Sequence, residues 1–145
     1  MSKSAQPETF SFSIKGIEIL GINLIFPSPD IKDIKTFNFN INAEQKISTE
    51  NNILLNFITV DILKEDNESK LGSINVNIIF EIVNFEEFID KKTKNVILPA
   101  EVLMVMNSIS ISTTRGVMFS QFKGTHLHNA ILPVIDPKQM TNQIK

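Results

Sequence analysis

The stretch that decides the fold is residues 36–48, TFNFNINAEQKIS, in which apolar and polar side chains alternate. Phe37, Phe39 and Ile41 fall on one side of an extended chain, together with Ala43, and the asparagines between them fall on the other. Successive side chains of a β-strand point to opposite faces of its sheet, so this period of two indicates a strand. We expect one face of that strand to be buried and the other to be solvated.

Three further strands are predicted around it. After a turn at residues 49–52, residues 53–64 are apolar on both faces, as expected for a central strand. A charged loop at 65–70 leads into a fourth strand at 71–85, and residues 12–26 form the first strand. Strands joined by short polar loops favour an antiparallel meander, in which each strand pairs with the next.

The apolar residues of the first strand change parity along its length. In chain order the groups are Phe12 and Ile14, then Ile17 and Ile19, then Leu20, Ile22 and Leu24. Gly16 and Gly21 lie near the two changes. One extra residue on one strand of a pair has this effect, so we predict a β-bulge or a strong local twist here.

Helical spacing replaces the alternation after a polar crossover at residues 86–95. Pro99 is tolerated in the first turn of a helix, where its missing N–H is not needed. Apolar residues then follow at spacings of three and four, namely Val102, Val105, Met106 and Ile109. Serine and isoleucine alternate within residues 107–114, a pattern that by itself favours a strand. The helical spacing of the residues before this stretch favours a helix instead. We predict about four turns, ending near Gly116.

The predicted fold class is therefore α+β: a four-stranded antiparallel sheet with a long helix and a short C-terminal helix from Asp136. The length of 145 residues suits one domain. Residues 1–9 are expected to be a disordered arm, residues 10–140 the folded domain, and residues 141–145 a polar tail.

The composition excludes several classes of function. The chain has no cysteine, so disulfides, thiolate zinc sites and a thiol nucleophile are excluded. Its net charge of −2 offers no basic stripe for nucleic acid. The first ten residues lack the apolar core of a signal peptide, and no apolar run approaches the ~18 residues of a membrane helix. We therefore expect a cytoplasmic protein that does not insert into membranes.

No catalytic or metal-binding motif stands out. The chain lacks a nucleophile elbow, a phosphate-cradling glycine loop and a His-Glu-x-x-His motif. His126 and His128 alone rarely make a closed metal site, so surface histidines are favoured. Asp61 and Glu81 could oppose each other on neighbouring strands, where a solvated acidic patch is favoured over acid–base chemistry. We expect no enzymatic activity, no metal and no cofactor.

Local motifs along the chain resemble the SecB family of export chaperones. The first strand ends in INLIFP at 22–27, the helix is preceded by NVILP at 95–99, and it closes with STTRG at 112–116. A hydrophobic-Pro-Val segment follows at 132–134. The order of four strands, a crossover, a long helix and a short helix is also that of the family, and the resemblance covers residue 10 to about residue 140.

The resemblance implies a cytoplasmic, ATP-independent holdase that binds unfolded preproteins in apolar grooves and passes them to the SecA motor. It also implies a homotetramer, a dimer of dimers with the sheets outside and the long helices between. Glu81 falls at the position of a family acid that docks the motor. Gly21 and Ile25 replace the acids expected on the first strand, which weakens the case for a SecA-type partner. Two alternatives are a SecB-like chaperone dedicated to one partner, such as an antitoxin, and a ligand-binding α+β domain.

Candidate site residues follow from the needs of a holdase, because adaptable apolar side chains suit varied clients. The predicted groove residues flank the strand ends, the crossover and the helix end: Phe10, Phe12, Phe85, Phe88, Met118, Phe119 and Phe122. Each of them could instead be core or subunit interface. Met104 and Met106 are predicted at the oligomer interface, with an ordinary core equally compatible. Arg115 is expected to stabilise the C-terminal end of the helix or to pair with a carboxylate across a subunit boundary.

Overall fold

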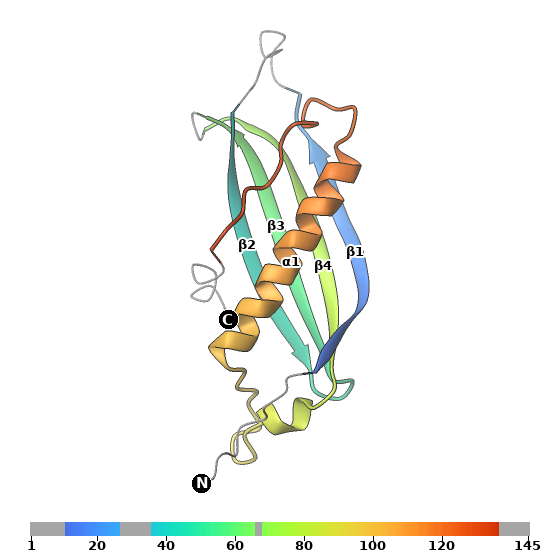
Figure 1. Ribbon diagram of the computed structural model, residues 1–145, viewed down its shortest axis with the longest axis vertical. Helices are drawn as coiled ribbons and strands as arrows, with labels where there is room; N and C mark the ends of the chain where they lie inside the picture. The colour runs from blue at the N-terminus through green and yellow to red at the C-terminus, as the bar shows by residue number, and fades with distance from the viewer. Residues whose placement is uncertain (1–10, 27–35, 66–67, 137–145) are drawn as a thin grey trace.

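One antiparallel sheet carries one long helix on a single face, as Figure 1 shows. The computed structural model describes residues 11–26, 36–65 and 68–136. Its elements are β1 (Phe12–Leu24), β2 (Phe37–Ser48), β3 (Ile53–Lys64), β4 (Lys70–Ile82), the 3-10 helix η1 (Phe85–Phe88) and α1 (Ala100–Gln121). The predicted α+β class is confirmed. The predicted arm, the polar tail and the residues beyond Asp136 that would form a short helix lie outside the described residues.

The strand order is β1-β4-β3-β2, so the predicted meander is right for β2, β3 and β4 but wrong for β1. β1 pairs with β4 at the far side of the sheet instead of with β2. The reason is visible in β4, where Val76, Asn77 and Ile78 are all buried in succession. A strand buried on both faces belongs in the interior of a sheet, and β1 provides its second neighbour.

The core lies between the helix side of the sheet and α1. Alternate residues of β3 and β4 face this side and are fully buried. The apolar ones are Leu54, Ile58, Val60, Ile62, Ile74, Val76, Ile78, Phe80 and Ile82. Burying such a side chain stabilises the fold by roughly 1.5–3 kcal/mol relative to leaving it exposed. The predicted central strand at 53–64 is confirmed with its bounds unchanged.

Two β-bulges explain the parity changes of β1. The register against β4 shifts between Ile14 and Gly16 and again between Ile19 and Gly21, so Lys15 and Leu20 are the extra residues. Directly opposite residues of an antiparallel pair share a face. The apolar residues opposite the buried face of β4 are Phe12, Ile14, Ile17, Ile19, Ile22 and Leu24. The bulge is therefore confirmed, and its effect is to turn every apolar residue of β1 except Leu20 to the helix side.

Helix α1 has 22 residues and continues beyond Gly116, so the predicted end was wrong. Its buried face repeats every four residues through Val102, Met106, Ser110, Thr114, Met118 and Phe122. Glycine inside a helix costs about 0.5–1 kcal/mol relative to alanine, which is less than burial of Met118 and Phe122 contributes. The turn that follows contains Gly124, whose φ of +83° suits glycine.

The crossover is longer and more closely packed than predicted. β4 ends at Ile82, and η1 follows at once with Phe85 and Phe88 buried. A bridge between Ile89 and Val96 then closes the loop. By length and composition α1 also suffices to cross a membrane, a test that core helices pass as well. Here one face of α1 is buried against the sheet.

Candidate functional site

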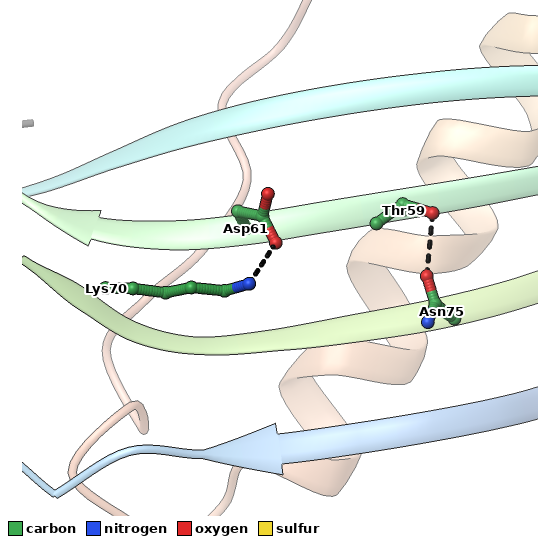
Figure 2. Close-up of polar contacts among 4 residues, drawn as sticks. All are labelled: Thr59, Asp61, Lys70 and Asn75. Atoms are coloured by element: carbon green, nitrogen blue, oxygen red, sulfur yellow. Dashed lines mark hydrogen bonds and ion pairs between the residues drawn. The ribbon is translucent and has the colours of Figure 1, made fainter.

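The outer face of the sheet, away from α1, carries paired polar groups (Figure 2). Asp61 forms an ion pair with Lys70 across β3 and β4 at 3.0 Å, and the Thr59 hydroxyl donates to Asn75 Oδ1 at 2.7 Å. Asp61 lies opposite Ser73, whereas Glu81 lies opposite Ile53 near the other end of this pair of strands. The two carboxylates are therefore not opposed, and they form no acid–base pair.

Glu81, the predicted docking residue, lies on this outer face near the end of β4. Its carboxylate pairs with Lys15 at 3.5 Å, and its side chain is partly exposed. Lys15 is the extra residue of the first bulge of β1. The bulge thus places a lysine beside the acid, so a basic partner at Glu81 would compete with a cation of the same chain. Docking at Glu81 stays a prediction.

The helix side of β1 carries a row of exposed apolar side chains. Ile14, Ile17, Ile19 and Ile22, here called the β1 isoleucine row, are between 39% and 47% exposed. They share a face with the core residues of β4, but α1 packs mainly on β3 and β4. An edge strand with an exposed apolar row is a usual site of association with another chain.

Two exposed phenylalanines follow or lie near the ends of β1 and α1, and both elements finish at the same end of the molecule (Figure 1). Phe26 is 74% exposed and its ring contacts the His126 ring at 4.9 Å between centroids. Phe119, in the last turn of α1, is 53% exposed. Both are large, exposed apolar side chains at one end of the molecule, so both are candidates for contact with a polypeptide.

Most predicted groove residues lie inside the core of this chain. Phe85, Phe88, Met118 and Phe122 are at most 6% exposed, so they present almost no surface to a client. Phe12 is half-buried and packs edge-on against Phe80, with 5.7 Å between ring centroids. Phe119 alone is well exposed. Phe10 lies outside the described residues. Client binding at Phe119 stays a prediction.

The two predicted interface methionines differ in position. Met106 is 1% exposed in the core of its own chain, because it belongs to the stripe of α1 that faces the sheet. Met104 lies off that stripe and is half-buried. The sequence left two positions open for Met106, the oligomer interface and the core of one chain. The structure places it in the core of one chain. Met104 keeps enough surface to contact a second subunit.

Arg115 contacts backbone carbonyls instead of the end of its own helix. Its Nε donates to Leu132 O at 2.7 Å, and its Nη2 donates to Pro133 O at 2.8 Å. Residues 130–135, here called the C-terminal strap, are thereby fixed beside α1. The strap and its contact with Arg115 were not predicted. The one signal in the sequence was the hydrophobic-Pro-Val motif that begins at Leu132.

The two histidines have different surroundings. His126 shares a hydrogen bond with Leu71 O at 3.0 Å, and His128 is exposed in a turn. Among the described residues, no three His, Asp or Glu side chains gather in a way that could hold a metal ion.

Comparison with known proteins supports the fold. No family model matches the sequence, and no curated protein matches it. The structure is similar to that of the Mycobacterium tuberculosis SecB-like chaperone Rv1957, solved in complex with a ChAD peptide from the Rv1956 HigA1 antitoxin. The TM-score is 0.61 at 10% sequence identity, over 86% of this chain and 89% of that chain. The resemblance to SecB-like chaperones is therefore confirmed at the level of the fold.

Proposed function

We propose that this protein is a cytoplasmic, ATP-independent holdase chaperone that binds non-native polypeptide through exposed apolar surface. The observation that carries the proposal is the SecB-like fold, shared with a chaperone that was solved bound to a peptide. The exposed side chains of Phe26 and Phe119 support it, because apolar contacts are non-directional and accept many sequences. Affinity for unfolded over folded chains then needs no reaction.

Two cavities lined by the described residues bear on the alternative of small-molecule binding. One lies on the outer face of the sheet beside Leu20 and Phe57, and the other lies beside Arg115. Each has a volume of about 160 Å³. Ligand pockets commonly enclose roughly 300–1,000 Å³, so both cavities are small for a cofactor or a metabolite.

Self-association is part of the proposal. The β1 isoleucine row is apolar, continuous and located at a sheet edge, which suits contact with a second copy. A homotetramer, which the resemblance to SecB implies, would cover this row. Handover to a SecA-type motor is not included, because Glu81 is already paired with Lys15 and no acid stands at Gly21 or Ile25.

A chaperone dedicated to one partner is the second candidate. The structural neighbour was solved with a peptide from an antitoxin, which favours a single polypeptide partner of that kind. The two candidates share the binding surface and differ in the range of clients. Binding of several unrelated unfolded proteins supports the general holdase, whereas binding of one protein alone supports the dedicated chaperone.

The binding surface can be tested with one substitution on α1. Phe119→Asp places a charge where an apolar client side chain would lie, and we expect about tenfold weaker binding of a labelled, permanently unfolded client. Ser120→Asp is the matched control, because Ser120 is the exposed neighbour of Phe119 in the same turn. Fluorescence anisotropy measures both affinities. Equal affinities in the two variants would remove Phe119 from the binding surface.

A further inference from the structure

The C-terminal strap lies along α1 in the manner of an extended peptide. Leu132 lies beside Arg115, and Figure 1 shows the strap running back along α1, against the direction of the helix. Val134 and Ile135 line one cavity together with Ser108 and Arg115 of the helix.

The strap is held by side chains and not by a sheet. Ala130 and Leu132 are buried in the core, whereas Ile131 is exposed and Val134 is 94% exposed. Within the described part of the chain, residues 131–135 make no backbone-to-backbone hydrogen bond. An element of this kind is attached by few contacts, and so it is among the parts of a fold that open most readily.

The contact with Arg115 does not depend on the sequence of the strap. The guanidinium donates to the main-chain oxygens of two successive residues, Leu132 and Pro133. Every extended polypeptide presents such carbonyls, and the fixed fork of an arginine suits them. The groove that contains the strap therefore offers what an unfolded client needs: an apolar site for alternate side chains and a donor for the backbone.

We propose that the C-terminal strap occupies a client-binding groove beside α1, as an internal substitute that an incoming polypeptide displaces. The inference rests on the proposed function and deepens it by naming the class of client. This client is an extended segment with apolar side chains at alternate positions, the inward one of leucine size, and with free main-chain carbonyls opposite Arg115. Displacement sets a threshold, because weakly apolar segments do not outcompete the strap.

The test is competition between the strap and the same sequence added in trans. The probe is a fluorescein-labelled synthetic peptide of residues 128–136, HNAILPVID. In full-length protein, Leu132→Ala removes the inward side chain of the strap but leaves the groove and the probe unchanged. We expect the probe to bind this variant about tenfold more tightly than the unaltered chain, or better, because the competing state is weakened.

Two further variants control this measurement. Ile131→Ala changes an exposed side chain of the same strap and should leave probe affinity within about twofold. Arg115→Met, combined with Leu132→Ala, removes the donor for both strap and probe and should abolish the gain. Equal probe affinity in the Leu132→Ala and Ile131→Ala proteins, or no binding by any variant, overturns the proposal.

A second readout covers the case in which Leu132→Ala does not fold. The chain contains no tryptophan, so Val134→Trp introduces a single reporter on an exposed part of the strap. Unlabelled peptide should lower the anisotropy of this tryptophan as the strap is released, and constant anisotropy with peptide bound contradicts displacement. Peptide displacement without retention of any unfolded client would count against the proposed function alone. Client retention with a strap that never moves would count against this inference alone.

Discussion

Asn56 is a fully buried amide in a strand whose other inward-facing residues are apolar. Its Nδ2 donates to Ser110 Oγ at 2.8 Å and to Asn107 Oδ1 at 3.0 Å, and its Oδ1 accepts from Gln45 Nε2 at 2.9 Å. Apolar contacts alone would allow α1 to slide along the sheet, whereas these directional bonds favour one position. The polar cluster therefore defines how helix and sheet fit together.

Replacing Asn56 by alanine should destabilise the fold by about 2–4 kcal/mol, because buried partners on β2 and α1 lose hydrogen bonds that water cannot replace. Urea unfolding measures the change. Asn75→Ala is the matched control, since Asn75 lies on the neighbouring strand and bonds to Thr59 on the exposed outer face (Figure 2). We expect Asn75→Ala to lower the free energy of unfolding by only about 0.5 kcal/mol. Similar losses in both variants would contradict the role given to the cluster.

Residue roles were the part of the site that the sequence predicted least. Phe85, Phe88, Met118 and Phe122 are of types that serve equally in a core and in a binding surface, and only the packing distinguishes the two. Asn56 and Asn107 are 51 positions apart, so no local pattern connects them. Gly116 predicts a helix end at Arg115, but α1 continues to Gln121.

At the scale of elements, β1 shows what a pattern can and cannot reveal. Its parity changes predicted bulges, and two are present. Each bulge returns the apolar residues that follow it to the helix side, with Leu20 as the exception. Strand bounds were predicted to within a few residues. The end of α1 was missed although the four-residue repeat of its buried face, which continues to Phe122, was present in the sequence.

The β1 isoleucine row gives a prediction at this scale. Ile17→Asp should shift the protein to a smaller oligomer while leaving its fold intact, because a charge would be buried in the interface between copies. Leu20→Asp is the control on the same strand, since Leu20 is also exposed but lies at the second bulge and lines the outer-face cavity. Sedimentation velocity measures the mass of each variant. An unchanged mass for Ile17→Asp would exclude the row as the interface.

For the whole molecule, the order of four strands followed by a long helix was enough to predict the class and the SecB resemblance. The topology was only partly predictable. β1 and β4 are the first and the last strand in the chain, and they pair with each other. Contacts between segments so far apart depend on how the whole sheet is buried, and no local pattern in the sequence indicates them. The two exposed faces of this architecture, the β1 isoleucine row and the end around Phe119, carry the proposed association and binding.

The most direct test of the account is light scattering from a chemically unfolded client diluted into buffer without ATP. This protein is added in near-stoichiometric amount, and an inert folded protein at equal mass serves as the control. The account predicts that several unrelated clients stay soluble only in the presence of this chain. Unchanged aggregation of all of them would contradict the general holdase and leave the chaperone dedicated to one partner as the better explanation.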